Sequence, residues 1–326
     1  MSSRIFIVGS GVVGAATGGG FREAGHDVTF IDISQDRVRE LAERGWDART
    51  EIDLSGEPES FIFLTLPTPN VGHRYDLSAF TAGTAAVGKA LAASAARHTV
   101  VVRSTVSPGI TEGLVKDTLE EHSGMKANEG FGLASNPEFL RAVSAAEDFA
   151  HPWMTVIAGR DPQVVESLRQ LLSPFGGEMR TFSNPAEAEF VKCAHNIYNA
   201  TKISFWNEMW LVAQKLGLDL DPIASTVARS SEGSINPNYG IRGGAPYGGV
   251  CLPKDTQGFL GFAKNVDVDM PLLSAVVEVN DRLAAIVSEE VDTATHALSH
   301  AQLREAAGGS KATVAAASGR QQHEPA

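Results

Sequence analysis

The sequence predicts an α/β fold in which a doubly wound parallel sheet is followed by an α-helical domain built on one long central helix. Short apolar strands alternate with amphipathic or alanine-rich helical stretches over the first half of the chain, as at residues 61–64, 77–96 and 100–102. That alternation is typical of a parallel sheet covered by helices on both faces. A later stretch from Ala186 to Leu216 has no helix breaker before Gly217, which predicts the long helix.

The size and composition of the chain fit two domains and a tail. Its 326 residues, 43% hydrophobic and 20% charged, are enough for about two globular domains. We place these domains at residues 1–185 and 186–300. Residues 301–326, rich in Ala, Gly, Ser and Gln, are expected to be a disordered tail.

Charge and hydropathy exclude several kinds of partner. The formal net charge of −12 argues against a nucleic-acid or anionic-membrane surface. No apolar run approaches the roughly 18 residues of a membrane span, and the chain runs into its first strand at residues 4–8 without a signal peptide. Cys193 and Cys251 stand far apart, so neither a disulfide framework nor a metal site is indicated. A cytoplasmic location is the simplest expectation.

A dinucleotide fingerprint follows the first strand. Gly9, Gly11 and Gly14 have the spacing G-x-G-x-x-G, and a helical stretch then leads to a second strand that ends in Asp32. In this Rossmann-like arrangement the glycines allow a tight turn, the approach of a pyrophosphate, and close packing of helix on strand. The helix start at Val12 and Val13 presents its positive end to the phosphates. Asp32 suits a ribose hydroxyl and repels a 2′-phosphate, so NAD is the predicted cofactor. The alternative is a glycine-rich turn without a ligand.

Polar loops follow three of the later strands. They lie at residues 65–69, 104–109 and 135–138. Each is an ordinary turn by itself, but ligands of open α/β sheets bind at the carboxyl ends of the strands. We therefore expect these loops to converge on the nicotinamide, with Thr68, Pro69, Ser104 and Thr105 as cofactor-binding residues.

Four polar residues share one side of the long helix: Glu189, Lys192, Asn196 and Asn199. The other positions are largely apolar, so we expect an otherwise buried helix whose polar side must find partners. A solvent-facing polar stripe explains the pattern equally well. The length of the helix suggests a spine between domains or a dimer interface.

The segment from Gly248 to Asp255 contains one of the two cysteines, Cys251, between a glycine pair and a Pro-Lys-Asp turn. Glycines beside a thiol let a ligand approach the sulfur, and the charge of Lys254 would favour the nucleophilic thiolate. A buried structural cysteine beside a surface turn is the alternative, and the segment alone leaves both open. Helices are also expected at about 221–230 and 271–299, the second with Asn280.

In this order, the dinucleotide domain, the Lys-x-x-x-Asn helix and the Gly-Gly-x-Cys-x-Pro-Lys-Asp loop resemble the UDP-glucose/GDP-mannose dehydrogenase family. Further shared motifs are Thr68-Pro69, Asp76-Leu77-Ser78, Ser104-Thr105-Val106 and Asn136-Pro137-Glu138-Phe139-Leu140, and the likeness runs from Ile5 to about Leu298. The resemblance implies oxidation of the C6 alcohol of a nucleotide sugar to a carboxylate with two NAD. UDP-glucose is the family's commonest substrate, and the family dimerises through the long helix.

The resemblance also implies a role for each site residue. Cys251 would attack the intermediate aldehyde, and the thiohemiacetal would be oxidised to a thioester. Lys192 and Asn196 would stabilise the oxyanion, and Glu138 would assist the water that hydrolyses the thioester. A water held by Thr105 and Asp255 would take the first proton. The substrate would contact the residues Phe139, Leu140, Lys192, Asn196, Arg242 and Gly248.

The sequence departs from the family pattern at several places. Ala142 replaces a second acid, Val250 replaces a common serine, and residues 151–154 replace a Pro-Asp-Arg motif. The loop at 239–244 lacks a central aromatic residue, and the sequence ends where the family's third domain would begin. These departures leave the substrate less certain than the type of catalysis.

Two alternative functions remain open at this point. The first is a two-electron β-hydroxyacid-type dehydrogenase, which shares the dinucleotide domain and long helix but needs no cysteine. The second is a truncated relative that binds NAD without turnover. The number of NADH formed per substrate separates them: two for the nucleotide-sugar dehydrogenase, one for the first alternative and none for the second.

Overall fold

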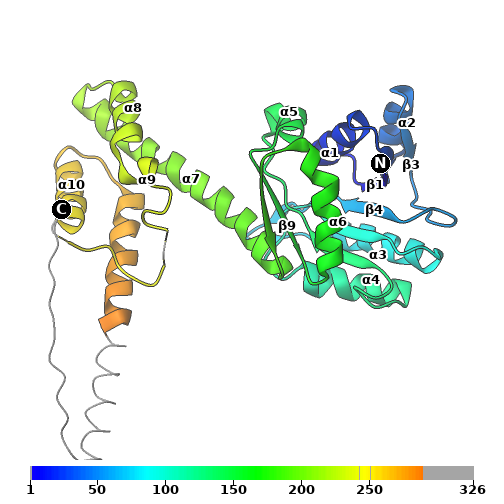
Figure 1. The fold of residues 1–326 in the computed structure, drawn as a ribbon. Helices are drawn as coiled ribbons and strands as arrows, with labels where there is room; N and C mark the ends of the chain where they lie inside the picture. The colour runs from blue at the N-terminus through cyan, green and yellow to red at the C-terminus, as the bar shows by residue number, and fades with distance from the viewer. Residues whose placement is uncertain (1, 242, 250, 289–326) are drawn as a thin grey trace, which may run out of the picture. The chain divides into compact units, whose positions relative to one another are not determined.

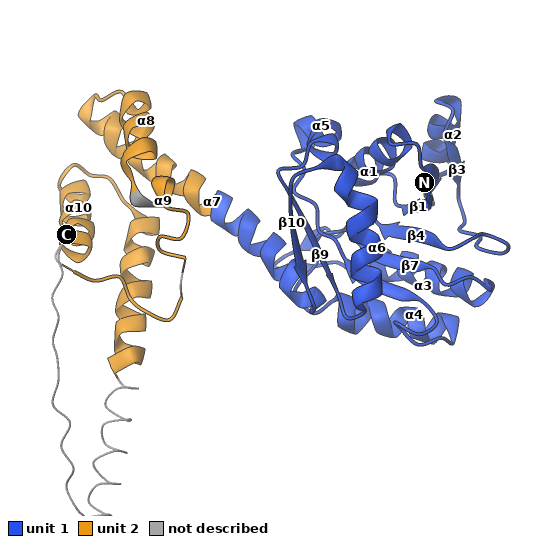
Figure 2. Cartoon of the chain, viewed as in Figure 1, with its two compact units in different colours: residues 1–199 blue, residues 200–326 orange. Residues whose placement is uncertain are grey.

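The computed structural model describes residues 2–241, 243–249 and 251–288. The chain divides into two compact units, Met1–Asn199 and Ala200–Ala326, which are coloured separately in Figure 2. The predicted disordered tail at 301–326 lies outside the described residues. Among the described helices, none combines the length and the hydropathy that crossing a membrane requires.

An eight-stranded sheet forms the centre of the first unit, and its order is β10-β9-β8-β7-β4-β1-β2-β3. Its strands are β1 (Arg4–Val8), β2 (Asp27–Ile31), β3 (Asp47–Arg49), β4 (Ser60–Leu64), β7 (Thr99–Val102), β8 (Gly132–Ser135), β9 (Met154–Gly159) and β10 (Glu178–Phe182). The chain builds outward from β1 through β2 to β3, and then starts again on the other side of β1 with β4. Ligands of doubly wound sheets bind at such a switch point, so the order places the site beside the carboxyl end of β1.

The predicted fold class is confirmed, with one correction to the strand directions. The six strands β3, β2, β1, β4, β7 and β8 are parallel to one another. Strand β9 pairs with β8 in the antiparallel sense, and β10 pairs with β9 in the parallel sense. The expectation of a parallel sheet therefore does not hold for the pairing of β9 with β8. The helix between β8 and β9, α5 (Ala145–Ala150), has only six residues. The rest of this connection contains only one further short helix, at Ala142–Ser144, and the strand that follows runs antiparallel to β8.

Helices cover both faces of the sheet (Figure 1). They are α1 (Val12–Glu23), α2 (Gln35–Glu43), α3 (Ser78–Ala92), the π-helical turn η1 (Thr111–Val115), α4 (Lys116–Ser123), η2 (Ala142–Ser144), α5, α6 (Pro162–Leu172) and η3 (Ser173–Phe175). A small hairpin of β5 (Asn70–Val71) and β6 (Arg74–Tyr75) follows β4.

Side-chain alternation along the strands divides the core between the two faces. Phe6 of β1 packs with Phe80 of α3 and Leu119 of α4 on one face, whereas Ile7 packs with Phe21 of α1 on the other. Successive residues of a strand point to opposite faces. Because helices bury both faces, β1 and its neighbouring strands are apolar at most positions on both faces.

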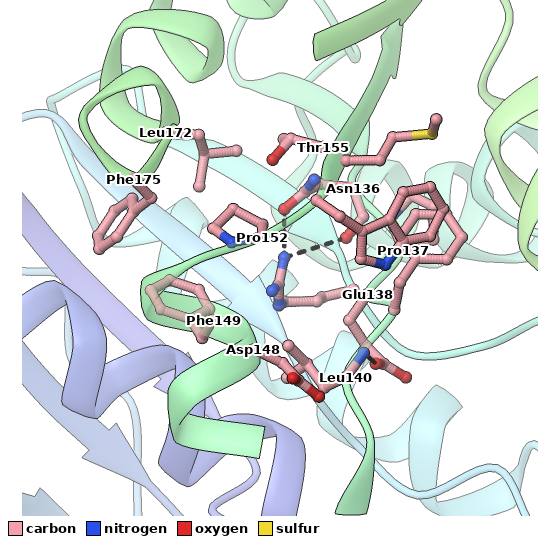
Figure 3. A pocket seen from close by; sticks show the side chains of 14 residues that line it. Asn136, Pro137, Glu138, Leu140, Asp148, Phe149, Pro152, Thr155, Leu172 and Phe175 are labelled. Atoms are coloured by element: carbon pink, nitrogen blue, oxygen red, sulfur yellow. Dashed lines mark hydrogen bonds between the residues drawn. The ribbon is translucent and has the colours of Figure 1, made fainter. Parts of the chain in front are cut away.

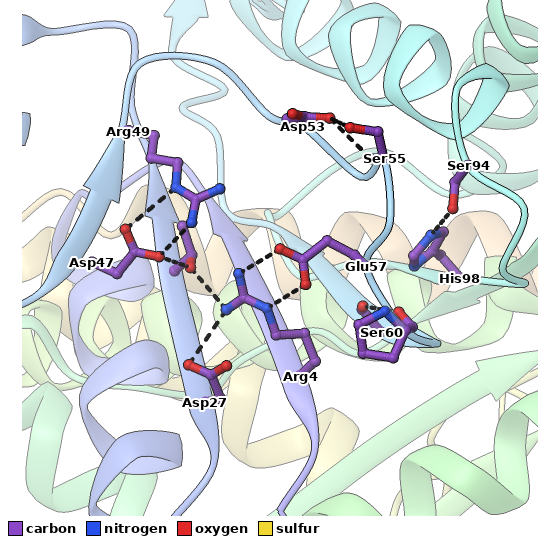
Figure 4. A network of polar contacts seen from close by, with 12 residues as sticks. Arg4, Asp27, Asp47, Arg49, Asp53, Ser55, Glu57, Ser60, Ser94 and His98 are labelled. Atoms are coloured by element: carbon purple, nitrogen blue, oxygen red, sulfur yellow. Dashed lines mark hydrogen bonds and ion pairs between the residues drawn. The ribbon is translucent and has the colours of Figure 1, made fainter.

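A polar network lies at the amino ends of the strands (Figure 4). Arg4, the first residue of β1, donates from Nε to Glu57 Oε2 at 2.9 Å and from Nη1 to Thr29 Oγ1 at 2.8 Å. The hydrogen bond from Arg4 lowers the pKa of Glu57 against the opposing effect of burial. This network lies at the amino ends of the strands, opposite their carboxyl ends, so we assign it a structural role.

The second unit is helical and has its own small core. Its elements are the C-terminal part of α7 (Pro185–Leu216), α8 (Leu220–Ser230), α9 (Glu232–Ile235), α10 (Cys251–Asn265) and a helix described over 271–288. The core gathers the buried residues Val212, Ala263, Val268 and Met270. The buried carboxylate of Glu208 accepts hydrogen bonds from the backbone N–H groups of Leu272 and Leu273. This carboxylate therefore caps the start of the helix at 271–288 and fixes it to α7.

Helix α7 has nearly the predicted bounds, but its burial differs from the prediction. The polar residues Glu189 and Lys192 are 2% and 5% exposed, whereas the apolar Phe190 and Tyr198 are 63% and 69% exposed. The expectation of an otherwise buried helix with one polar side is therefore wrong for the single chain. Within the described part of the chain, these apolar side chains of α7 are exposed to solvent.

Candidate active site

A large cavity lies at the carboxyl ends of β1, β2, β4 and β7. Its volume is about 1020 Å³, which is at the upper end of the size range of small-molecule sites. Its wall includes the fingerprint and the end of β2 (Gly9, Ser10, Gly11, Val12, Val13, Asp32) and, at the ends of later strands, Thr65, Leu66, Pro67, Thr68, Arg103, Ser104, Thr105 and Glu138. The sheet thus brings together most of the predicted cofactor-binding residues.

Two of the three fingerprint glycines are required by their surroundings. Gly9 has φ +96°, and a Cβ there would lie 2.7 Å from Thr65 O. A Cβ on Gly14 would lie 2.0 Å from Gly9 O, whereas a Cβ on Gly11 would meet nothing within 4 Å. Gly9 and Gly14 therefore shape the turn, and Gly11 leaves open space at the start of α1. No side chain caps this helix start, so its backbone N–H groups are available to a phosphate.

Asp32 lies at the end of β2 as a well-supported anion. Its Oδ2 accepts hydrogen bonds from Ser10 N at 3.0 Å and Ser10 Oγ at 2.5 Å, and its Oδ1 accepts from Ser34 N at 3.0 Å. Burial opposes ionisation, but these hydrogen bonds outweigh it and lower the pKa of the carboxyl group. The open glycine turn, the free helix start and this fixed negative charge fit the pyrophosphate and ribose of NAD.

Short hydrogen bonds hold the loops after β4 and β7 together. Thr68 Oγ1 donates to Thr105 O at 2.7 Å, and Ser104 Oγ donates to Leu66 O at 2.7 Å. Thr68, Ser104 and Thr105 line the cavity. Pro69 is absent from the lining, and its carbonyl accepts a hydrogen bond from Asp76 N, which closes the β5–β6 hairpin.

A buried ion pair joins the loop after β8 to helix α7. Lys192 Nζ lies 3.2 Å from Glu138 Oε1, and the two side chains are only 6% and 11% exposed. Glu138 Oε2 also accepts the backbone N–H of Leu140 at 2.5 Å, and Lys192 Nζ lies 5.4 Å from the centre of the Phe139 ring. The structure thus gathers four predicted site residues around one buried ion pair.

Asn196 is not part of this buried cluster. It is exposed, and its stripe neighbour Asn199 pairs with His195, with 3.0 Å between Asn199 Nδ2 and His195 Nε2. The predicted polar stripe is therefore buried at Glu189 and Lys192 and exposed at Asn196 and Asn199. Cys193 of the same helix is half-buried, and its thiol donates to Val106 O at 3.5 Å.

Glu189 was on the predicted stripe, but its structural role was not foreseen. Its carboxylate accepts Gly109 N at 2.5 Å, Thr111 N at 2.8 Å and Thr111 Oγ1 at 2.6 Å. Burial raises the pKa of Glu189 although these hydrogen bonds oppose the shift. The contact fixes α7 to the loop that follows Thr105, and so positions Lys192 one turn further along the helix.

Figure 3 shows a small cavity of about 30 Å³, with Asn136 and Phe149 labelled in its wall. Arg103, also unforeseen, is another residue of this wall. Its guanidinium donates to Thr17 Oγ1 at 2.9 Å and to Asn136 Oδ1 at 2.5 Å. Asn136 in turn donates from Nδ2 to Val156 O at 2.7 Å. These bonds fix the start of the segment that carries Glu138.

The second unit presents Cys251 as the first residue of α10, with its side chain exposed. The positive end of a helix favours a nearby anion, and thiolates are stabilised at helix starts. Lys254 Nζ lies 3.1 Å from Asp255 Oδ1, and both side chains are 69% exposed. Lys254 is therefore paired with a carboxylate, and the helix start is the clearer source of positive potential at the sulfur.

The loop before Cys251 is held from the helix at 271–288. Asn280 Oδ1 accepts the backbone N–H of Tyr247 at 2.7 Å. Gly249 has φ +78°, a conformation that favours glycine. Gly248 precedes it in the same loop, whereas the predicted substrate residue Arg242 lies outside the described residues. Within the part of the chain that the structure describes, no cluster of three His, Cys, Asp or Glu side chains could hold a metal ion.

Two family models match this chain. The NAD binding domain of the UDP-glucose/GDP-mannose dehydrogenase family matches residues 3–46 and 43–176. The central domain of the same family matches residues 186–282.

Individual relatives agree with these matches. The chain is 31% identical to a UDP-glucose 6-dehydrogenase of Haloferax volcanii, over 88% of this chain and 72% of the relative. It is 31% identical to a GDP-mannose 6-dehydrogenase of Pseudomonas aeruginosa, over 85% of this chain and 68% of the relative.

Solved structures show the same likeness. The structure of a GDP-mannose dehydrogenase from Pseudomonas aeruginosa matches with a TM-score of 0.81 and 28% identity, covering 90% of this chain and 71% of that chain. An imine reductase of Streptomyces aurantiacus matches with a TM-score of 0.62 but only 16% identity, over 86% of this chain and 94% of that chain. The second likeness concerns the fold alone. From the matches to both domains and to these relatives, the chain belongs to the UDP-glucose/GDP-mannose dehydrogenase family, and its N-terminal domain is the family's NAD binding domain.

Proposed function

We propose that this protein oxidises the C6 alcohol of UDP-glucose to the carboxylate of UDP-glucuronate through a covalent intermediate on Cys251. The proposal depends chiefly on one observation: Cys251 is exposed at the start of α10. A buried thiol would support the alternative of a structural cysteine. An exposed thiol beside a helix start has the access and the favourable potential that a nucleophile requires.

The chemistry proceeds in two oxidations. NAD supplies the hydride acceptor for each of them. In the first, the alcohol loses a hydride from C6 and a proton to a water held by Thr105 and Asp255, which leaves an aldehyde. Cys251 thiolate then adds to the aldehyde carbon to form a thiohemiacetal. This adduct restores a tetrahedral carbon from which a second hydride can leave, and the product is a thioester.

Hydrolysis of the thioester completes the reaction. Glu138 assists the attacking water, and cleavage of the carbon–sulfur bond releases the carboxylate and returns the Cys251 thiol. In total, one alcohol and one water give one carboxylic acid, and two NAD are reduced. The hydrogen bond from Leu140 N to Glu138 Oε2 and the ion pair of Oε1 with Lys192 hold the carboxylate in one orientation.

Lys192 and Asn196 stabilise the negative oxygen of the tetrahedral adducts in this proposal. The burial of Lys192 supports its part, because a fixed charge acts more strongly in a site from which water is excluded. Asn196, which is exposed, is one turn further along α7 on the same side. The backbone at Phe139 and Leu140, together with Arg242 and Gly248, is the proposed contact surface for the rest of the substrate.

We also propose that the protein forms a homodimer through α7. This helix exposes large apolar side chains, among them Phe190 (63%), Tyr198 (69%), Ile203 (63%) and Trp210 (49%). Apolar side chains gathered on one element of a soluble protein commonly mark an interface. A monomer at micromolar concentration in sedimentation-velocity experiments would contradict this part of the proposal.

The experiment that tests the function offers a panel of nucleotide sugars with NAD, measures NADH, and identifies the product by mass. We expect two NADH for each UDP-glucose and a uronic acid product. Acid formation from GDP-mannose instead would replace the substrate but keep the mechanism. One NADH with an aldehyde or keto product would support the two-electron dehydrogenase, and NAD binding without any turnover would support the non-catalytic relative.

A further inference from the structure

Arg103 is a buried cation whose direct partners are all uncharged. It follows the last residue of β7 and is 6% exposed. Its hydrogen bonds go to Thr17 Oγ1, Asn136 Oδ1 and Asn136 O, at 2.9, 2.5 and 3.5 Å. Its guanidinium carbon also lies 5.3 Å from the centre of the Phe149 ring. A charge this deeply buried is normally paired with a carboxylate.

The charges around Arg103 do not cancel its own. No carboxylate of the described residues forms an ion pair with it. The closest acidic influence is Glu138, but that carboxylate is already paired with Lys192 at 3.2 Å. Burial lowers the pKa of Arg103 to about 10, partly offset by Glu138, so the guanidinium remains protonated at neutral pH. The side chains of Arg103, Glu138 and Lys192 together carry one net positive charge.

This charge belongs to a residue in the wall of the cofactor cavity. Arg103 lines that cavity together with Ser104, Thr105 and Glu138. The fingerprint and Asp32 also line the cavity, and they bind the pyrophosphate and the adenosine ribose in this type of domain. The nicotinamide is expected at the loops after β4 and β7, and Arg103 directly precedes Ser104 in the second of these loops.

We propose that the uncompensated charge of Arg103 makes the site favour the reduced cofactor over the oxidised one. The nicotinamide ring carries a positive charge when oxidised and none after it accepts a hydride. A fixed cation nearby repels only the oxidised ring, and the repulsion is larger in a partly buried site than in water. Arg103 would thereby promote both hydride transfers of the proposed reaction. This role rests on the proposed function, whereas its test requires only the binding of the two forms of the cofactor.

The test measures the dissociation constants of NAD and NADH separately, by calorimetry and by NADH fluorescence, without any sugar. Wild-type protein is compared with Arg103→Met, which removes the charge, and Arg103→Lys, which keeps it. We expect Arg103→Met to lower the ratio of Kd for NAD to Kd for NADH by roughly fivefold or more, as for the loss of a unit charge near the ring. Arg103→Lys should leave the ratio within about twofold of the wild type, since lysine retains a point charge.

A merely structural role for Arg103 predicts a different result. Arg103→Met would then weaken NAD and NADH equally and leave their ratio unchanged, which would overturn the proposal. Asn136→Asp provides a second variant if Arg103→Met does not fold, because it places a carboxylate next to the guanidinium without removing it. It should lower the same ratio, and an unchanged ratio in folded Asn136→Asp protein would also overturn the proposal. Because neither ratio requires turnover, failure of the proposed sugar oxidation would not affect this result.

Discussion

Removal of the Glu189 carboxylate should loosen the attachment of α7 to the loop after β7. The side chain is 2% exposed and accepts three hydrogen bonds, from Gly109 N, Thr111 N and Thr111 Oγ1. At about 1 kcal/mol for each hydrogen bond, Glu189→Ala should lower the free energy of unfolding by roughly 3 kcal/mol. Glu189→Gln keeps one acceptor oxygen for Thr111 and loses the bond to Gly109, so it should lose about 1 kcal/mol.

Urea denaturation of the wild type and the two variants measures this difference. The control is Lys202→Ala, which alters an exposed residue of the same helix and should change stability by no more than about 0.5 kcal/mol. Equal stability of Glu189→Ala and the wild type would refute the anchoring role, because three buried donors would have lost their acceptor without consequence.

The pH dependence of the same experiment has a definite sign. Burial raises the pKa of Glu189 above its ordinary value of 4.5, so the folded state favours the protonated form. The contribution of Glu189 to stability is then complete below that ordinary value and declines as the pH rises through the folded-state pKa. The stability advantage of the wild type over Glu189→Gln should therefore shrink toward neutral pH. An advantage that grows with pH would contradict the burial argument.

Three further predictions concern the site itself. Lys192→Ala should reduce kcat by about 10²- to 10³-fold while the Kd for NAD stays within about twofold, because an oxyanion donor acts on the transition state; an unchanged kcat would remove Lys192 from the mechanism. Gly14→Ala should abolish NAD binding or folding, because the added Cβ would lie 2.0 Å from Gly9 O. Gly11→Ala should fold normally, because its Cβ would enter open space, but it should bind NAD less tightly. Normal NAD binding by Gly14→Ala would show that the turn can rearrange. Asp32→Asn should weaken NAD binding and reduce discrimination against NADP by about tenfold, through the loss of charge next to the ribose, and isothermal titration with both cofactors would reveal any failure of this expectation.

The parts of the fold that depend on local sequence could be predicted. The fingerprint glycines, the apolar strands and the breaker-free run to Leu216 each encode their structure within a short segment. The short strands β3, β5, β6 and β10 were not foreseen, since β3 and β10 are polar edge strands and β5 and β6 have two residues each. The antiparallel direction of β9 depends on the path of the preceding segment, which periodicity does not contain.

The supporting residues of the site were harder to foresee than the reactive ones. Glu189 was visible as part of a polar stripe, but its partner Thr111 lies 78 residues earlier in the chain. Arg103 precedes the Ser-Thr motif, but only the folded sheet shows that it is buried beside Thr17 and Asn136. The burial along α7 differed from the prediction because a 3-4-3 spacing identifies one side of a helix without saying which side faces the protein.

The role of Cys251 is the central claim, and acid formation by Cys251→Ala tests it most directly. The product from UDP-glucose and NAD would be identified by mass for the wild type, Cys251→Ala and Cys251→Ser. Cys193→Ala serves as the matched control because it alters the other, half-buried cysteine. The covalent mechanism predicts uronic acid from the wild type and from Cys193→Ala, and none from either Cys251 variant. Acid formation by Cys251→Ala at a near-normal rate would contradict it.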